Sequence, residues 1–260
     1  MSRNPASTER DAGSVGPDSL PFARDAASFD QAADVYERAR PSYPVEAVEW
    51  LVPPGARTVL DLGAGTGKFT RLLAAERIIA VDPSERMLDQ LRAAVPRADA
   101  RLGSAEHIPV DDGSIDTVVA AQAWHWVDQE RATAEVARVL RPGGTLGLIW
   151  NIRDERVGWV ADLSRVIHYS EAERALRDEV LIGPPFGPTE TFAIEWNRTS
   201  SPESLLALVE SRSYLITATP ERRAEVLDGV RDLIAKHPDL AGKGSFELPY
   251  RTHCFRATLR

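Results

Sequence analysis

Short apolar runs alternate with helix-compatible segments between Thr58 and Trp150, and this alternation restricts the fold more than any other feature of the chain. Helical spacing of apolar residues separates the runs, and Ser84 and Asp128 stand where two of the helices can be N-capped. Alternating strands and helices are typical of a parallel sheet covered on both faces, so we predict a doubly wound α/β fold. The expected strands are Thr58–Leu62, Ile78–Val81, Ala98–Leu102, Ile115–Ala121 and Thr145–Trp150.

The pattern is weaker on both sides of this region. Upstream we expect a disordered tail over Met1–Arg24, which has few large apolar residues, and then helices over Phe29–Ala39 and Val45–Leu51. Two alternating segments near the C-terminus, Thr191–Arg198 and Ser245–Ala257, are expected to be strands that pair antiparallel at the edge of the sheet. Further helices are expected at Trp159–His168, Glu171–Val180, Pro202–Val209 and Pro220–Lys236.

Composition argues against several classes of function. The 260 residues carry a formal net charge of −8, and an acidic surface repels phosphate backbones, so we expect no nucleic-acid partner. No apolar run reaches the roughly 18 residues of a membrane span, and no apolar leader is visible, so we expect no membrane partner and a cytoplasmic location. The single cysteine, Cys254, can form neither an internal disulfide nor a multi-cysteine metal site. It is expected to be a packed strand residue, and no metal is expected.

A glycine-rich loop directly follows the first strong strand. Glycines there let the backbone turn sharply and approach a ligand, and we expect the following residues to open a helix whose first amides face that ligand. A dinucleotide fingerprint would need glycine at Lys68, and a phosphate-binding P-loop would need glycine at Leu62. A purely structural turn stays open as an alternative. The pattern that fits is acidic-x-G-x-G-x-G, in the run Asp61-Leu62-Gly63-Ala64-Gly65-Thr66-Gly67.

Asp82 ends the second expected strand. A carboxylate at this place can accept two hydrogen bonds from the hydroxyls of a ribose. Dehydrogenases share this feature, so Asp82 indicates a nucleoside without specifying which one. A helix-capping role is the alternative, although Ser84 makes such a cap less necessary.

Together these features resemble the class I S-adenosylmethionine-dependent methyltransferases, and the resemblance covers about Phe29 to Ile152. It implies a Rossmann-like, seven-stranded, mostly parallel sheet with an antiparallel last strand, and S-adenosylmethionine as the cofactor. The residues that it assigns to cofactor binding are Tyr36, Arg40, Asp61, Gly63, Ala64, Gly65, Gly67, Asp82, Pro83, Met87, Ser104, Ala105, Glu106 and Gln122.

Three further segments carry the same resemblance. The run Gly103–Glu106 is similar to the family's third motif, although Ser104 stands at the position that is usually acidic. Arg138–Gly144 is similar to the stretch before the fifth strand, where the role is structural. The run Tyr36–Pro44 is similar to the lid of the trans-aconitate methyltransferase-like group, in which Tyr36 and Arg40 would close over the site. A surface helix followed by a proline turn is the alternative for this last segment.

The end of the fourth strand is expected to face the reacting atoms. The resemblance implies that Gln122 lines the cofactor and that His125 and Trp126 lie near the methyl group or the acceptor. His125 is the candidate general base, to be used only if the acceptor must lose a proton. A carboxylate acceptor would need no base but would favour cations such as Arg40 or Arg153. Core packing of His125 and of the neighbouring tryptophans is the alternative.

We therefore interpret the chain as a methyltransferase that acts on a small molecule, with an oxygen of a carboxylate or hydroxyl favoured as acceptor, and as a monomer or homodimer. A nicotinamide-dependent oxidoreductase and a non-catalytic cofactor-binding protein are the alternatives. The expected layout after the tail at 1–24 is lid helices at 25–55, a cofactor-binding core at 56–151, a substrate cap at 152–190 and the rest of the sheet at 191–260.

Overall fold

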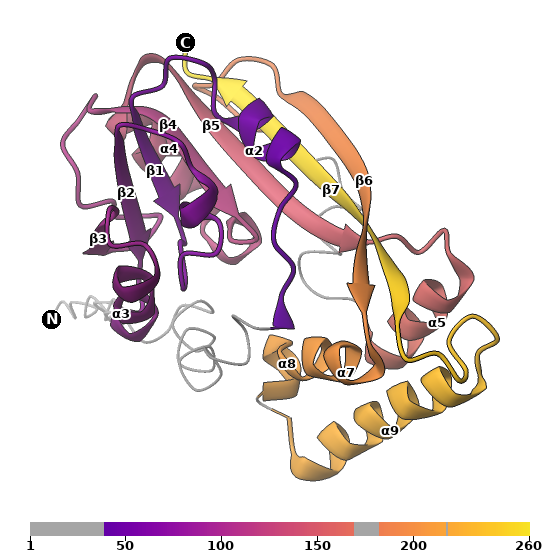
Figure 1. Ribbon diagram of the computed structural model, residues 1–260. Coiled ribbons are helices and arrows are strands. Elements are labelled where there is room, and N and C mark those ends of the chain that lie inside the picture. The colour runs from indigo at the N-terminus through magenta and orange to yellow at the C-terminus, as the bar shows by residue number, and fades with distance from the viewer. Residues whose placement is uncertain (1–38, 169–181, 217) are drawn as a thin grey trace, which may run out of the picture.

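The computed structural model describes residues 39–168, 182–216 and 218–260. Within them, seven strands form one sheet in the order β3-β2-β1-β4-β5-β7-β6 (Figure 1). Strands β1 to β5 run parallel, and β7 lies antiparallel between β5 and β6. The predicted seven-stranded Rossmann-like sheet with an antiparallel last strand is confirmed. The strands are β1 (Thr58–Leu62), β2 (Arg77–Asp82), β3 (Asp99–Leu102), β4 (Ile115–Ala121), β5 (Leu140–Arg153), β6 (Glu190–Ser200) and β7 (Phe246–Thr258).

Helices cover both faces of the sheet because successive strand residues point to opposite sides. Helices α2 (Val45–Leu51) and α3 (Glu85–Ala94) pack on one face, against residues such as Ile78, Ala80 and Cys254. Helix α4 (Gln129–Val139) packs on the other face, against residues such as Leu60 and Leu148. Cys254 is fully buried, as expected for a packed strand residue, and burial raises the pKa of its thiol to about 12.

The two predicted N-caps are present. The Ser84 hydroxyl accepts a hydrogen bond from the Met87 amide at 3.2 Å, and the Asp128 carboxylate accepts one from the Arg131 amide at 3.2 Å. Each bond satisfies an amide that has no partner within the first helical turn. The chain therefore enters α3 directly after the end of β2, and it enters α4 after the 3-10 turn Trp124–Trp126 that follows β4.

A separate group of helices lies at the end of the molecule toward which β5 and β6 run (Figure 1). Its apolar side chains, among them Trp159, Leu205 and Val230, form a second core together with Leu248 and Tyr250 of β7. The antiparallel pair β6–β7 thus extends past the parallel strands and supports a helical cluster beside their carboxyl ends. Its members are α5 (Gly158–Ile167), α7 (Pro202–Glu210), α8 (Ser213–Ile216) and α9 (Pro220–Lys236).

Two expectations about local structure are wrong. The glycine loop opens no α-helix, because only a single 3-10 turn (Thr70–Leu72) separates it from β2. Gly67 has a left-handed φ of +85°, and the nine residues between it and the start of β2 hold this 3-10 turn and otherwise turns and extended backbone. Strand β5 begins at Leu140 rather than at Thr145, since Leu140 pairs with Ile115 across an irregularity in the register. Most of the helix expected over Phe29–Ala39, the helix over Glu171–Val180 and the N-terminal tail lie outside the described residues.

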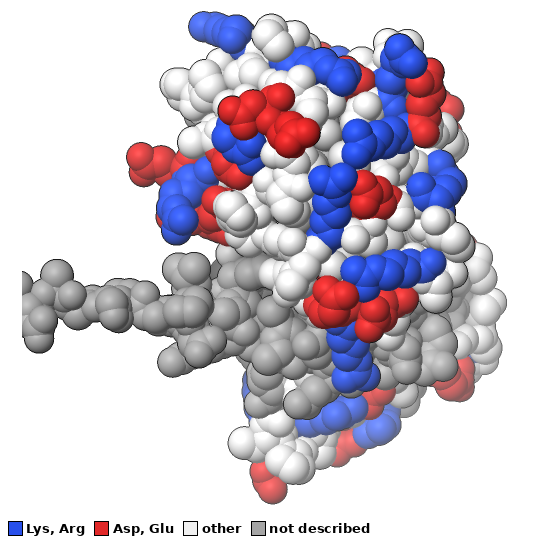
Figure 2. Space-filling view, turned by 90° about the vertical axis from the view of Figure 1, so that its left-hand side faces the viewer, with Lys and Arg blue, Asp and Glu red and all other residues white. Residues whose placement is uncertain are grey.

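Basic and acidic side chains are interspersed over the face shown in Figure 2. On α3, Arg92 pairs with Glu85 and Asp89, and near β3 both Arg77 and Arg101 pair with Asp99. Such exposed pairs contribute little to stability, roughly 0–1 kcal/mol each.

Among the described residues, no helix has the length and hydropathy needed to cross a membrane.

Candidate functional site

Two pockets meet at the carboxyl ends of the parallel strands, and Gly63 lines both of them. The first, which we call the polar pocket, is bordered by the glycine loop and by Arg40, Asp61, Gln122, Arg153, Leu208 and Tyr250. The second, which we call the apolar slot, is bordered by Leu62, Val81, Pro83, Ser104, Ala105, Ala123 and Trp124. Open α/β sheets bind ligands at this edge. A ligand that passes Gly63 would have a polar end in one pocket and a flat apolar end in the other.

The glycine loop takes a conformation that depends on its glycines. Gly63, Gly65 and Gly67 have φ values of +70°, +55° and +85°, in the left-handed region that favours glycine. A Cβ atom on Gly63 would lie 2.6 Å from the Cβ atom of Ala123, so Gly63 is also needed for space. The amides of Gly63 and Ala64 donate to the Val81 carbonyl at 2.8 and 3.1 Å, which fastens the loop to β2.

Asp61 lies in the wall of the polar pocket and is fully buried. Its Oδ2 atom accepts a hydrogen bond from the Thr70 hydroxyl at 2.6 Å, whereas its buried Oδ1 atom has no hydrogen-bond partner within the described part of the chain. Burial raises the pKa of Asp61 to about 7; the Thr70 hydrogen bond opposes this rise and the charge of Asp82 adds to it. A buried carboxylate oxygen of this kind is suited to a cationic group of a ligand.

Asp82 is engaged by the backbone on both sides. Its Oδ2 atom accepts a hydrogen bond from the Gly65 amide at 2.8 Å, and its Oδ1 atom accepts one from the Ser84 amide at 2.9 Å. Asp82 therefore holds the glycine loop and the start of α3 in place. Since each carboxylate oxygen can accept more than one hydrogen bond, these contacts are compatible with ribose binding, which stays a prediction.

The other residues predicted for the nucleoside differ in their positions. Pro83, Ser104 and Ala105 line the apolar slot. Glu106 accepts a hydrogen bond from the Asp128 amide at 3.0 Å, so it joins this loop to the start of α4. Met87 is buried on α3 and is not among the residues that line either pocket.

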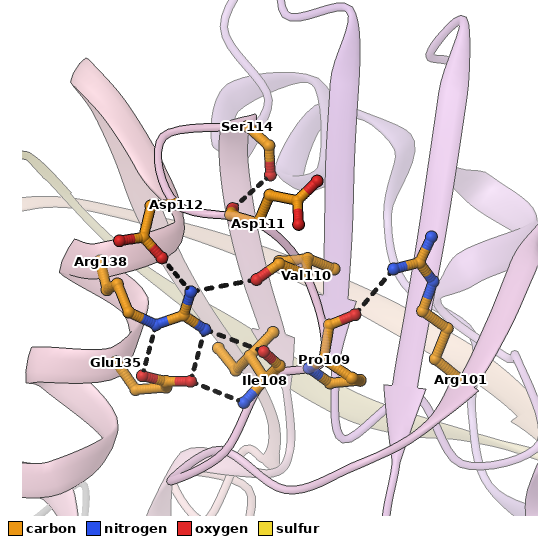
Figure 3. Close-up of polar contacts among 9 residues, drawn as sticks. All are labelled: Arg101, Ile108, Pro109, Val110, Asp111, Asp112, Ser114, Glu135 and Arg138. Atoms are coloured by element: carbon orange, nitrogen blue, oxygen red, sulfur yellow. Dashed lines mark hydrogen bonds and ion pairs between the residues drawn. The ribbon is translucent and has the colours of Figure 1, made fainter.

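Arg138 holds the loop that follows the apolar slot (Figure 3). Its guanidinium group donates to the carbonyls of Ile108 and Val110 at 2.9 and 3.0 Å and pairs with Glu135 and Asp112. Glu135 in turn accepts a hydrogen bond from the Ile108 amide at 2.9 Å. These contacts confirm the structural role expected for the segment before the fifth strand. They fasten the continuation of the Ser104–Ala105 wall to α4.

We expect Arg138→Met to lower the free energy of unfolding by about 2 kcal/mol, because two backbone carbonyls and the Glu135 carboxylate lose a charged partner. Denaturant unfolding followed by circular dichroism measures this change. Arg131→Met is the matched control on the same helix, since the Arg131 side chain is exposed, and its effect should be near zero. Equal stability of the two variants would contradict the stabilising role assigned to Arg138.

The segment just before α2, residues 39–44, is held beside the polar pocket by hydrogen bonds that its backbone carbonyls accept. Arg198 donates to the Ala39 carbonyl at 2.5 Å, Lys68 to the Arg40 carbonyl at 3.1 Å, and Asn151 to the Ser42 carbonyl at 2.9 Å. The Tyr43 ring meets Phe69 edge to face, with centroids 5.1 Å apart. Arg40 and Tyr43 line the pocket, whereas Tyr36 lies outside the described residues.

Gln122 and His125 follow β4 but face different surroundings. Gln122 has a φ of +56°, lines the polar pocket and donates to the Asn151 carbonyl at 3.1 Å. His125 is not among the lining residues, and its Nδ1 atom accepts a hydrogen bond from Trp150 Nε1 at 3.1 Å. Burial and, to a smaller extent, the positive charge of Arg40 together lower the pKa of His125 to about 4. Trp124 is packed in the core, as the alternative reading of that segment had it.

Several pocket residues carry no signal in the sequence. Asn151, Leu208 and Tyr250 come from β5, α7 and β7, and each is an ordinary residue in its own segment. The pairing of β5 with β7 brings Asn151 close to Tyr250, and the packing of α7 in the second core adds Leu208. In the described part of the chain, no group of His, Cys, Asp or Glu side chains is arranged to hold a metal ion.

Comparison with known proteins gives consistent results. Residues 60–148 match the family described as a methyltransferase domain. An uncharacterized methyltransferase of Mycobacterium tuberculosis is 53% identical over 234 residues, which cover 89% of this chain and 96% of that protein. A solved structure of a candidate type II methyltransferase from Anaeromyxobacter dehalogenans is 26% identical, with a TM-score of 0.62 over 85% of this chain and 97% of that one.

A third relative matches a shorter region. The malonyl-[acyl-carrier protein] O-methyltransferase of Methylococcus capsulatus is 44% identical over 107 residues, which cover 38% of each protein. The Mycobacterium match, by contrast, covers most of this chain and so extends well beyond the span of the sequence motifs.

Proposed function

Because the chain belongs to the S-adenosylmethionine-dependent methyltransferase family, we propose that it transfers a methyl group to a carboxylate oxygen of a small molecule. Family membership decides against the oxidoreductase and against a purely binding role. The observation that carries the choice of acceptor is the pair of arginines, Arg40 and Arg153, on the wall of the polar pocket. A guanidinium group binds a carboxylate through parallel hydrogen bonds and so fixes its orientation.

The two pockets fit the cofactor. We assign the apolar slot to the adenine of the cofactor and Asp82 to its ribose. The cofactor would then pass close to the glycine loop beside Gly63. Oδ1 of Asp61, which is buried without a partner, is assigned to the ammonium group of the methionine part. Bound S-adenosylmethionine supplies an electrophilic methyl group on a sulfonium that is already a good leaving group.

The chain's own contribution is alignment and exclusion of water. Arg40 and Arg153 hold the acceptor carboxylate, and Gln122, fixed by the Asn151 carbonyl, borders the same space. Pro41 and Tyr43 of the segment before α2 and the side chain of Leu208 border the pocket as well. Holding an acceptor in line in this way replaces a bimolecular encounter with an oriented one, which is a large source of rate acceleration.

The surroundings of His125 favour a carboxylate over a hydroxyl as the acceptor. A hydroxyl must lose its proton to a base, and a histidine with a pKa of about 4 accepts a proton poorly at neutral pH. His125 also accepts the Trp150 indole N–H, so we assign it to positioning Trp150. Asp61 is committed to the cofactor. A carboxylate is already ionised and needs no base, and the name of the Methylococcus relative also specifies transfer to oxygen.

The test is an activity screen against carboxylic acids, phenols and amines, with detection of base-labile methyl esters. We expect esters from carboxylic acids, and we expect His125→Gln to retain kcat within about tenfold, because loss of a general base costs 10²–10⁴-fold. His253→Gln on β7 is the control, since burial also lowers the pKa of His253 and, like His125, it does not line the polar pocket. Turnover of phenols alone, or a His125→Gln variant that binds cofactor but is inactive, would overturn the proposal.

A further inference from the structure

A series of hydrogen bonds crosses strands β6, β7 and β5 and ends at the segment before α2. The Trp196 indole donates to the Thr252 hydroxyl at 2.8 Å, and this hydroxyl donates to Oδ1 of Asn151 at 2.6 Å. The Asn151 side chain donates in turn, through Nδ2, to the Ser42 carbonyl at 2.9 Å. We call these four residues the Asn151 network. Thr252 is fully buried and Asn151 is only 8% exposed, so the middle of the network lies out of water.

The register of the sheet places these side chains. Asn151 and Thr252 are directly paired residues of β5 and β7, so their side chains emerge on the same face. Trp196 lies two residues along β6 from Ile194, the partner of Thr252, and residues two apart along a strand share a face. The Trp196 ring is also stacked on Tyr250, with centroids 5.0 Å apart. Packing therefore fixes the donor at which the network begins.

The two ends of the network fix the direction of every bond in it. An indole N–H can only donate, and a backbone carbonyl can only accept. Because the Thr252 hydroxyl accepts from Trp196, its single proton goes to Asn151, and the atom that receives it must be the amide oxygen. The amide nitrogen is then the atom that faces Ser42. The orientation of the Asn151 amide, which is ambiguous for an isolated asparagine, has one solution here.

The backbone of Asn151 holds a second part of the pocket wall. Its carbonyl accepts the side-chain amide of Gln122 at 3.1 Å, and the backbone amide of Gln122 donates to the Ile149 carbonyl at 2.9 Å. Gln122 has a φ of +56°, which is unfavourable for a residue other than glycine and persists only where its surroundings stabilise it. The two hydrogen bonds to β5 supply this stabilisation.

The Ser42 carbonyl lies between two residues that border the polar pocket. Pro41 and Tyr43 both line it, and the proline rings of Pro41 and Pro44 restrict the backbone of this short segment. A hydrogen bond to the Ser42 carbonyl therefore limits where its two neighbours can lie. Asn151, which lines the pocket itself, connects this segment with the residue that follows β4.

We propose that Asn151 is a positioning residue for methyl transfer, which fixes Gln122 and residues 41–43 relative to each other and so aligns the acceptor with the methyl group. This inference rests on the proposed function in one respect, because the polar pocket is taken to hold the acceptor. Misplacing the wall of such a site lowers the rate of an in-line transfer more than it lowers the affinity for the cofactor.

Asn151→Asp tests the proposal through the direction of the bonds. An ionised carboxylate still accepts from Thr252 but cannot donate to the Ser42 carbonyl, whereas a protonated carboxyl can do both. With saturating cofactor and the best carboxylic acid from the ester assay, we expect kcat to be lowered about 100-fold at about pH 8 relative to the unmodified protein. This ratio should recover at least about tenfold as the pH falls to about 5.5, because burial raises the pKa of the introduced carboxyl.

Two further variants and a control accompany this measurement. Asn151→Ala removes donor and acceptor together, so its kcat should be low at every pH. Thr252→Val keeps the shape of the side chain but leaves the Asn151 amide without a fixed direction, so kcat should fall about tenfold; it serves if the Asn151 variants do not fold. Asn197→Asp is the control, because Asn197 lies exposed on β6, and its kcat should equal that of the unmodified protein at each pH.

A purely structural role would lower stability without a recovery of kcat at low pH. The inference is overturned if folded Asn151→Asp keeps kcat within about threefold of the unmodified protein at about pH 8, or if its kcat ratio does not recover as the pH falls. Titration with S-adenosylhomocysteine should show that the cofactor site of this variant is intact, with an affinity within about threefold of the unmodified protein.

Crystal structures of Asn151→Asp at the low and the high pH separate this result from the proposed function, since they need no turnover. Displacement of residues 41–43 at the high pH alone, without methyl ester formation, would support Asn151 as the residue that positions the pocket wall and would remove the carboxylate as the acceptor. The same position of residues 41–43 at both pH values would overturn the inference.

Discussion

Replacing Gly63 with alanine is expected to weaken S-adenosylmethionine binding at least 100-fold while the sheet stays folded. The φ of +70° at this position disfavours any side chain by about 1–2 kcal/mol, and the added Cβ atom would lie 2.6 Å from the Cβ atom of Ala123. The loop must therefore shift where the polar pocket and the apolar slot meet. Each 1.4 kcal/mol lost from binding is a tenfold loss in affinity, so a clash and a displaced wall together account for an effect of this size.

Gly113→Ala is the matched control for this prediction. Gly113 has a similar φ of +56°, but a Cβ atom there would meet nothing within 4 Å, and the residue lies in the loop before β4. We expect this variant to show the backbone penalty in denaturant unfolding and to bind cofactor normally in titration calorimetry. A folded Gly63→Ala variant whose affinity is within about threefold of the unmodified protein would contradict the assigned path of the cofactor past Gly63.

The parallel half of the sheet could be predicted closely from the sequence. Strands β1 and β4 have the expected bounds, because a continuous apolar run bounded by turn residues is the signature of a strand buried on both faces. The prediction of a helix after the glycine loop is wrong for a physical reason. Apolar residues at Phe69, Leu72 and Leu73 fit one 3-10 turn as well as the first turn of a longer helix, and the spacing alone does not give its length.

The two halves of the candidate site differ in how far they could be predicted. The cofactor half lies in contiguous motifs that each follow a strand end, so local patterns identify Asp61, Gly63 and Asp82. The acceptor half is assembled by long-range pairing. Tyr250 meets Arg153 and Trp196 only because β7 inserts between β5 and β6, and an isolated Tyr in an alternating strand carries no sign of this. The position of Leu208 depends likewise on how the helical cluster packs.

The largest pH effect is expected from Asp61. Its pKa is about 7 in the folded protein against 3.8 when unperturbed, so the folded state retains a proton that the unfolded state loses as the pH rises between these values. The contribution of this group to stability therefore falls as the pH rises through this window and levels off above about pH 7, by about 4 kcal/mol in total. Asp61→Asn should remove this dependence and be more stable than the unmodified protein at about pH 8.

Binding should show the opposite trend, because an ammonium group of the cofactor favours the ionised carboxylate. We expect the affinity for S-adenosylmethionine to rise between about pH 5.5 and 7 in the unmodified protein. Asp61→Asn should lose roughly 1.5–3 kcal/mol of the free energy of cofactor binding at about pH 7.5 and show no such rise.

Thr70→Val is the informative control. It retains the carboxylate but removes the hydrogen bond that lowers its pKa, so the rise should move to higher pH rather than vanish. Titration calorimetry over this pH range measures all three proteins, and equal affinities at about pH 7.5 would show that Oδ1 of Asp61 does not face the cofactor.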